Sequence, residues 1–184
     1  VWNKKKGKIM FKFLRYFIQT GLFFIFTNTM ATESPVLHMV LEKGIVKIKT
    51  FSEKAPNTVK RIIELSESGF YDGLTFHRVI SGFMAQGGDP KGDGTGGSGK
   101  NIKAEFNDIK HERGIVSMAR ANDPDSADSQ FFICYDSHPF LDGKYTVWGK
   151  VIEGMNLIDR IPEGKGQNGQ VLRNPTKIIT IRLK

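Results

Sequence analysis

The chain has 184 residues, 39% of them hydrophobic and 25% charged, so it can bury one hydrophobic core and has little room for a second domain. Its formal net charge is +8, but six of its 27 basic residues precede residue 30, where the sequence has no Asp or Glu. The other 21 face 19 acidic residues, a net of +2, which excludes the strong positive field typical of nucleic-acid-binding proteins.

The beginning of the chain has the layout of a secretory signal peptide. A basic start is followed by a largely apolar run at 16–26 and a small, polar stretch with Thr29 and Ala31. The apolar run is too short for a membrane span, which needs about 20 residues. Alternatively, translation starts at Met30. We therefore assign residues 1–35 to a leader or an upstream extension with a short linker. We expect a periplasmic or secreted protein in the first case and a cytoplasmic one in the second.

The pattern then changes to one of strands and a helix. Residues 36–51 form two alternating runs around Lys43-Gly44, which predicts a hairpin. A helix is predicted to begin at Pro56 and to end at Gly69. One face of it recurs at helical spacing and contains Val59, Ile62, Ile63 and Ser66.

The rest of the chain is dominated by short runs of β-forming residues. Such runs lie at 76–80, 114–119, 131–135, 146–151 and 176–184. A second, short helix is predicted near 153–161, before Pro162. About eight strands and two helices, with no alternation of strand and helix, predict a mainly β fold, a closed or nearly closed barrel capped by helices.

Residues 82–99 hold eight of the 20 glycines and contain two approximate phosphate-binding sequences. GDGTGG at 92–97 fits the spacing of a dinucleotide-binding fingerprint, but no helical pattern follows it. GTGGSGK at 94–100 approaches a P-loop, but Asn101 stands where a Ser or Thr would bind Mg²⁺. We interpret the segment as a surface loop whose glycines permit positive φ angles, and we expect no nucleotide and no other cofactor.

The remaining polar residues indicate neither metal nor covalent chemistry. The four histidines and the single cysteine lack zinc-type spacing, and no GxSxG sequence marks a nucleophilic serine. Asp89 and Asp93 are interpreted as solvated turn residues, His77 as a hydrogen-bonded structural histidine, and Cys134 as a buried thiol.

Residues 76–89, FHRVISGFMAQGGD, resemble the signature segment of the cyclophilin family of peptidyl-prolyl cis/trans isomerases. Further matches follow in the same order: GTGG (94–97), GIVSMARA (114–121), SQFFIC (129–134) and PFLDGKYTVWGKV (139–151). The resemblance implies an isomerase domain over residues 36–184. It also implies an eight-stranded antiparallel closed barrel capped by two α-helices, with a shallow proline-binding groove on its outer face.

Position by position, the resemblance implies a site for X-Pro peptides. Arg78 matches the family's catalytic arginine. The other matched positions are an apolar proline pocket (Phe83, Met84, Phe132 and Leu141), its polar border (Gln86 and Gln130) and the strand along the peptide's path (Ala119, Arg120 and Ala121).

Two further substrate-binding positions depart from the eukaryotic pattern. Phe140 replaces a tryptophan and Tyr145 replaces a histidine, as in bacterial members, and the missing indole donor implies weak binding of cyclosporin. The implied partners are proline-containing peptides and unfolded client proteins. We expect a monomer, with no nucleic-acid partner and no stable membrane insertion of the mature domain.

The implied reaction needs no bond to be cut. Rotation about a peptide bond faces a barrier of ~18–20 kcal/mol because the nitrogen lone pair is delocalised into the carbonyl. A guanidinium that donates to the nitrogen binds the twisted amide better than the planar one, and only such differential binding accelerates the step. The alternative is a proline-peptide binding module or chaperone in which turnover is incidental. Without the family match, Phe83, Met84 and Phe132 would be interpreted as core residues and Arg78 as a solvated charge.

Overall fold

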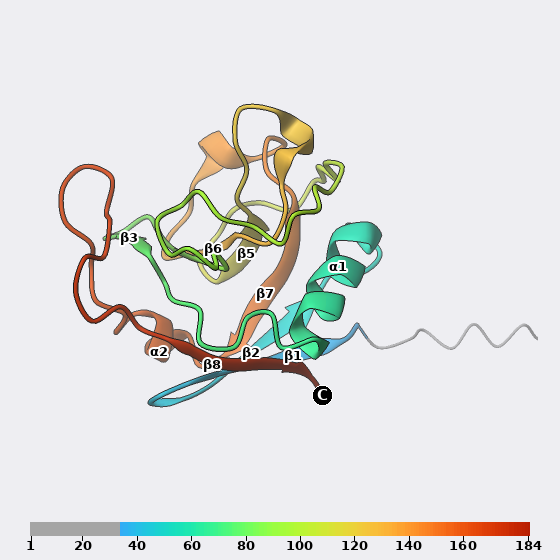
Figure 1. The fold of residues 1–184 in the computed structure, drawn as a ribbon. Helices are drawn as coiled ribbons and strands as arrows, with labels where there is room; N and C mark the ends of the chain where they lie inside the picture. Colours follow the sequence, from blue (N-terminus) through green and yellow to red (C-terminus); the bar gives the residue numbers. More distant parts are fainter. Residues whose placement is uncertain (1–33) are drawn as a thin grey trace, which may run out of the picture. The chain divides into compact units, whose positions relative to one another are not determined.

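The computed structural model describes residues 34–184, so the leader, its cleavage point and the alternative start at Met30 lie outside the described residues. The described part contains eight strands, two α-helices and two 3₁₀ turns (Figure 1). The strands are β1 (Val36–Leu41), β2 (Gly44–Thr50), β3 (Arg78–Ile80), β4 (Met84–Gly87), β5 (Ile115–Met118), β6 (Phe131–Cys134), β7 (Val147–Glu153) and β8 (Ile178–Leu183). The helices are α1 (Pro56–Glu67) and α2 (Met155–Ile158), and the 3₁₀ turns are η1 (Pro124–Ser126) and η2 (Pro139–Leu141).

The strands form one antiparallel sheet in the order β3-β4-β6-β5-β7-β2-β1-β8. The expected closed barrel is an overstatement, because no ladder joins its end strands β3 and β8 in the described structure. An isolated bridge connects Thr75 to Lys177, just before each of these strands, and Phe76 N donates to Thr176 O at 3.0 Å. The sheet is therefore a strongly curled half-barrel. β3 is only three residues long and is too short to continue the ladder.

The outer edge of β3 is covered by a loop from the C-terminal part of the chain. Val79 N donates to Gly169 O at 2.7 Å, and Gly164 N donates to Val79 O at 2.9 Å. Gly169 has φ +64°, and a Cβ there would lie 2.7 Å from Val79 O, so only glycine permits this approach. The loop 164–170 thus protects an edge that would otherwise be open for pairing.

The strands around β4 are buried on both faces. On the inner face, Val79, Ala85 and Ile133 belong to the main hydrophobic core, together with Trp148. On the outer face, four residues form a second, smaller cluster: Met84, Phe132, Cys134 and Leu141. The second cluster forms the base of the site described below.

Most predicted elements are confirmed, with shorter bounds. The β1–β2 hairpin turns at Glu42-Lys43, one residue earlier than expected, and α1 begins at Pro56 and ends at Glu67. On its buried face Leu65 takes the place expected for Ile63, which is half-buried. The interpretation of the whole segment 82–99 as a loop is wrong at its start. Residues 84–87 form β4, whose four residues are too few to show alternation.

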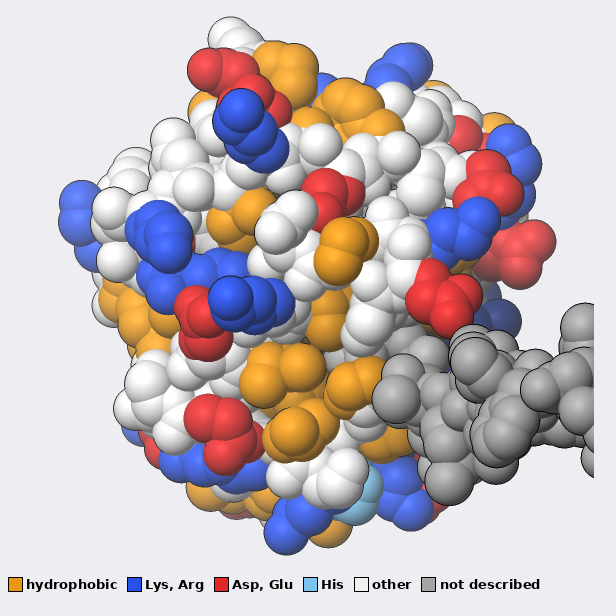
Figure 2. Space-filling model, turned by 90° about the vertical axis from the view of Figure 1, so that its right-hand side faces the viewer, with side chains coloured by type: hydrophobic (Ala, Val, Ile, Leu, Met, Phe, Trp, Pro, Cys, Tyr) orange, Lys and Arg blue, Asp and Glu red, His pale blue; other side chains and the backbone are white. Residues whose placement is uncertain are grey.

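The surface of the described part carries charges of both signs. On the face seen in Figure 2, acidic and basic side chains are interspersed around hydrophobic ones. From residue 34 onward, no helix combines the length and the hydrophobicity that crossing a bilayer would require.

Candidate functional site

Strand register brings the predicted site residues onto one face of the sheet. Arg78 lies opposite Gln86 across β3 and β4, Gln86 lies opposite Phe132 across β4 and β6, and Phe132 lies opposite Ser117 across β6 and β5. Directly opposed residues project to the same side of a sheet. The row Arg78–Gln86–Phe132 therefore points outward. The adjacent residue in each strand points the other way and belongs to the main core, as Val79, Ala85 and Ile133 do.

A groove of about 480 Å³ opens over this row. Ten of the predicted site residues line it: Arg78, Phe83, Met84, Gln86, Ala119, Arg120, Phe132, Phe140, Leu141 and Tyr145. The other two, Ala121 and Gln130, line an adjoining depression of about 330 Å³, whose wall also contains Gln86, Ala119 and Arg120. The predicted residues are thus gathered in two neighbouring hollows.

The guanidinium of Arg78 is held from two sides. Its Nε donates to the Asn168 carbonyl at 2.9 Å, and its Nη1 donates to Gln86 Oε1 at 3.0 Å. Among the described residues its Nη2 has no hydrogen-bond partner. Burial lowers the pKa of this group from its ordinary value, and Tyr145 opposes that effect. An arginine keeps its charge near neutral pH, so a fixed cation with one free donor group faces the groove.

A relay of amide hydrogen bonds connects Arg78 to the glycine-rich loop. Gln86 Nε2 donates to Gln130 Oε1 at 2.9 Å. Gln130 Nε2 in turn donates to the carbonyls of Gly96 at 2.8 Å and Gly94 at 3.1 Å. The position of the loop is therefore coupled to the orientation of the guanidinium.

The interior of the groove is apolar and partly aromatic. Phe132 is 5% exposed and lies in the second cluster, whereas Phe140 is 59% exposed at the rim. The Phe83 and Phe140 rings lie 5.7 Å apart, and Phe83 also meets His138 edge-on at 4.9 Å. Such a slot accepts a small apolar ring.

Arg120 forms the opposite rim. Its guanidinium lies 4.7 Å from the centre of the Tyr145 ring, a cation–π arrangement, and its Nε and Nη2 both donate to the Lys144 carbonyl at 3.0 Å. Its charge is thus directed at neighbouring protein groups.

A buried Ser and a buried His lie beneath Phe132, next to a half-buried Asp. His111 stacks on the Phe132 ring with centroids 6.0 Å apart, its Nδ1 is 3.1 Å from Asp142 Oδ1, and its Nε2 is 3.1 Å from Ser117 Oγ. Burial lowers the pKa of His111 against the raising effect of Asp142. Ser117 Oγ donates its one proton to the Thr146 carbonyl at 2.9 Å, so this hydroxyl is held by the backbone as well as by its contact with His111. Ser117 is fully buried, so a substrate cannot reach it as a nucleophile.

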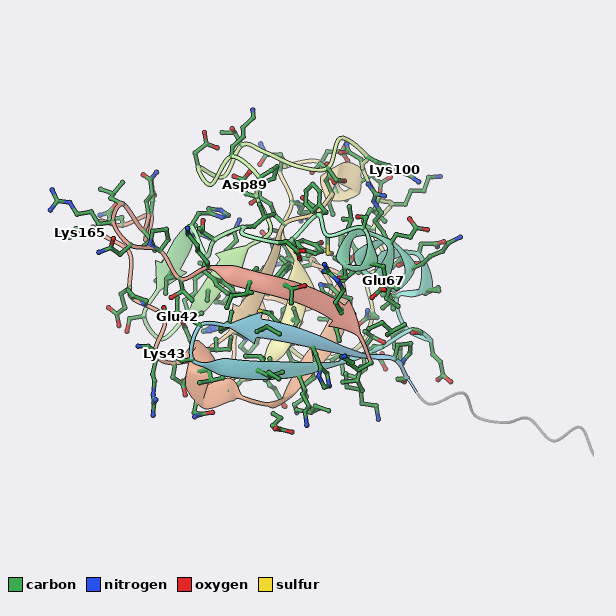
Figure 3. All side chains as sticks on the ribbon, turned by 60° about the horizontal axis from the view of Figure 1, so that its bottom comes forward. Glu42, Lys43, Glu67, Asp89, Lys100 and Lys165 are labelled. Carbon is green, nitrogen blue, oxygen red and sulfur yellow. The ribbon has the colours of Figure 1, made fainter. Side chains whose placement is uncertain are left out.

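Asp89 was expected in solvent, and that prediction is wrong. Its side chain is buried and organises the glycine-rich loop (Figure 3). Oδ1 accepts from Lys91 N at 2.8 Å, and Oδ2 accepts from Asp93 N at 3.1 Å and from Gly94 N at 2.6 Å. A Cβ on Gly96 would lie 2.0 Å from Asp89 Oδ1, so a glycine there leaves room for the carboxylate. Asp93, by contrast, is exposed as expected.

His77 was expected to be hydrogen-bonded, and that prediction is also wrong. It is 3% exposed and lines the groove, but neither ring nitrogen has a hydrogen-bond partner within residues 34–184. Burial lowers the pKa of this imidazole and outweighs the negative charge of Asp89, which raises it. The neutral form of His77 is therefore favoured. Cys134 is buried as expected, and burial raises the pKa of its thiol to about 12.

The groove also contains residues that the sequence did not indicate. They are His77, Asp93, Gly94, Asn168 and Gln170. Asn168 contacts Arg78 through its backbone carbonyl, which no side-chain pattern reveals. Within residues 34–184, no three His, Cys, Asp or Glu side chains are grouped to hold a metal ion.

Comparisons with known proteins agree with this geometry. Residues 36–183 match the family model "Cyclophilin type peptidyl-prolyl cis-trans isomerase/CLD". A peptidyl-prolyl cis-trans isomerase of Synechococcus elongatus is 44% identical over 142 residues, covering 77% of this chain and 91% of the relative. A probable peptidyl-prolyl cis-trans isomerase of Brucella abortus is 41% identical over 175 residues, which is 89% of each chain.

A solved structure has the same fold. It is the crystal structure of a cyclophilin-type isomerase from Cryptosporidium parvum, determined in the presence of the dipeptide Ala-Pro. It is 34% identical, has a TM-score of 0.73 and covers 81% of this chain and 98% of its own. Because the family model, the relatives and the fold agree over nearly all of residues 36–183, the chain belongs to the cyclophilin family and is a peptidyl-prolyl cis-trans isomerase.

Proposed function

We propose that Arg78 is the catalytic residue of this isomerase. The observation that supports this role is the clamp on its guanidinium, which Asn168 O and Gln86 Oε1 hold beside the apolar slot. In the twisted amide the lone pair returns to the proline nitrogen, and a donor fixed nearby stabilises that state more than either planar isomer. A donor that is oriented beforehand does not have to reorganise during the reaction.

The surrounding residues divide into a pocket and a path. Phe83, Met84, Phe132 and Leu141 hold the proline ring, with Phe140 and Tyr145 at the rim. Ala119, Arg120 and Ala121 line the path of the flanking peptide, and Gln86 and Gln130 orient the guanidinium and border the path. The connection between the groove and the adjoining depression supports this division, because it leaves an extended peptide room on both sides of the proline.

The test compares Arg78→Ala and Arg78→Lys with wild type on an X-Pro tetrapeptide, by protease-coupled kinetics and NMR exchange. We expect kcat/KM to fall about 10²- to 10³-fold for Arg78→Ala, the loss typical of one oriented charge-stabilising donor. Arg78→Lys keeps a charge but not the planar fork, so most of the loss should persist. Arg173→Ala, at an exposed arginine that does not line the groove, is the matched control. Wild-type rates for Arg78→Ala would contradict the role.

We further propose unfolded, proline-containing client proteins as substrates, and weak binding of cyclosporin because Phe140 has no indole donor. The protein acts as a monomer, in the periplasm or outside the cell if the leader is cleaved and in the cytoplasm if translation starts at Met30. N-terminal sequencing together with fractionation of the native host decides between these locations. Titration with cyclosporin tests the affinity, and sedimentation tests the monomer.

The alternative physiological role is that of a proline-peptide binding module or chaperone in which turnover is incidental. This role predicts that Arg78→Ala complements a deletion strain and restores the wild-type phenotype. Phe132→Ala should not complement it, because binding would depend on the pocket alone. Loss of complementation by Arg78→Ala, with the protein still folded, would exclude it.

A further inference from the structure

A second groove, separate from the catalytic one, lies where the β1–β2 hairpin meets α2. Its volume is about 500 Å³, and it has no lining residue in common with the catalytic groove. Figure 3 shows Glu42 and Lys43 at the tip of the hairpin, away from Asp89 and the glycine-rich loop. We call it the hairpin groove and define it by Leu157, Pro162, Pro175 and Ile179 with the charged residues named below.

The walls of the hairpin groove are apolar and conformationally fixed. Leu157 of α2 packs against Gly44, where a Cβ would lie 2.9 Å from its Cδ1. Pro162 and Pro175 restrict the backbone on two sides. Asn174 also lines the groove, and with φ 48° it is the only residue other than glycine with a positive φ in the described chain. A wall that is already ordered loses little freedom when a ligand binds.

The rim of the hairpin groove has an excess of positive charge. Lys43, Arg160 and Lys177 line it with Glu42 as the only carboxylate. None of the three cations forms an ion pair within residues 34–184, so their charges are not neutralised by a neighbouring carboxylate. Ile179, which is 51% exposed, places an aliphatic side chain beside them.

We propose that the hairpin groove binds an extended, acidic peptide segment of a partner protein that carries aliphatic side chains. Opposite charge at the rim supplies the complementarity, and the apolar walls accept the aliphatic groups. A concave hollow suits a peptide better than a flat lipid surface. The site is independent of isomerisation and gives the enzyme a second point of attachment to a client or an assembly, which raises the local concentration of a tethered client.

The experiment uses the full chain and a short fluorescein-labelled peptide of alternating Asp and Leu that contains no proline. Anisotropy titrations compare wild type with the variant Lys43→Glu/Arg160→Glu/Lys177→Glu and with Ile179→Ser. We expect affinity to fall at least about tenfold in the triple variant. The matched control reverses three exposed, unpaired cations elsewhere, as Lys60→Glu/Lys100→Glu/Lys103→Glu, and should leave affinity unchanged. Peptides of Lys and Leu, or of Asp and Ser, should bind weakly.

Independent readouts separate this proposal from the catalytic one. Backbone amide shifts on adding the peptide should map to residues 41–45 and 174–179, Ala-Pro should not compete, and the triple variant should keep wild-type isomerase activity. The proposal is overturned if the peptide does not bind, if the control variant loses affinity equally, or if Ala-Pro displaces the peptide. It is also overturned if the chain binds only phosphatidylglycerol vesicles through these residues, or if they mediate only self-association.

Discussion

Replacing Asp89 by Asn should destabilise the protein far more than a surface Asp→Asn change, because Asp89 is buried and accepts three backbone N–H groups. Asparagine keeps one acceptor oxygen. If that oxygen accepts from Asp93 N–H and Gly94 N–H, the amide NH₂ of the asparagine faces Lys91 N–H. The charge-assisted hydrogen bond from Lys91 is then lost, and two donors face each other. A hydrogen bond to a charged group contributes about 1.5–3 kcal/mol, so the free energy of unfolding should fall by about 2–4 kcal/mol.

The assay is urea and thermal unfolding at neutral pH. For a domain of this size the expected loss corresponds to a drop in Tm of roughly 5–15 °C. Asp93→Asn is the matched control, since this carboxylate is exposed and caps only Thr95, and it should lower the stability far less than Asp89→Asn does. Because Asp89 holds the loop that positions Gln130, the variant should also lose isomerase activity at temperatures where it is folded.

The pH dependence provides a second check. Burial alone would raise the pKa of Asp89, but backbone N–H groups of Lys91, Gly94 and Gly96 outweigh it and hold the pKa below its ordinary value. The stabilisation by a carboxylate with a depressed pKa is complete above the unfolded value and is lost as the pH falls through the folded one. The stability difference between wild type and Asp89→Asn should therefore be constant near neutrality and shrink below about pH 4. Equal stability of the two proteins at pH 7 would refute the reasoning.

Three further predictions concern the groove. Gln86→Leu should lower kcat about tenfold with little change in KM or Tm, because it releases one side of the Arg78 clamp; an increase in KM alone would contradict a positioning role. Gly169→Ala should lower the free energy of unfolding by more than about 1 kcal/mol and also lower kcat, because its Cβ would lie 2.4 Å from Ile80 Cγ1 and displace the loop that holds Arg78. Unfolding midpoints measure the loss of stability and steady-state kinetics measure kcat. Wild-type values for both would contradict the expected steric strain. Phe132→Ala should raise KM about tenfold and cost about 3 kcal/mol, whereas Phe132→Leu should recover most of the stability in the same melts; equal losses would exclude a packing role.

The strands were predictable where hydrophobic runs are long or alternate. Residues 36–50 alternate over a hairpin, and residues 131–134 form a run buried on both faces, so each was recognised. The strand at 84–87 was not, because its four residues end in Gly87 and are followed by Gly88, so they resemble a loop in composition. Its place between β3 and β6 is decided by pairing with residues far away in the sequence, which local propensity does not predict.

The site was predictable to the extent that it consists of side chains within recognisable motifs. Arg78 and Phe132 were found in this way, but Asn168 acts through its backbone carbonyl and contributes no motif. Asp89 resembled any aspartate in a glycine-rich turn, and only the three N–H groups converging on it reveal its burial. The unpartnered nitrogens of His77 follow from packing, which a single sequence does not encode in a readable form.

The opposite orientation of neighbouring residues in β3, β4 and β6 has a practical consequence for engineering. In these strands, residues that face the groove alternate with residues of the main core, so the two sets can be randomised in separate libraries. Selection for a new peptide preference at Phe140, which is 59% exposed at the rim, would cost little folding stability. An evolving lineage has the same freedom, and can retune what it binds while its interior stays unchanged.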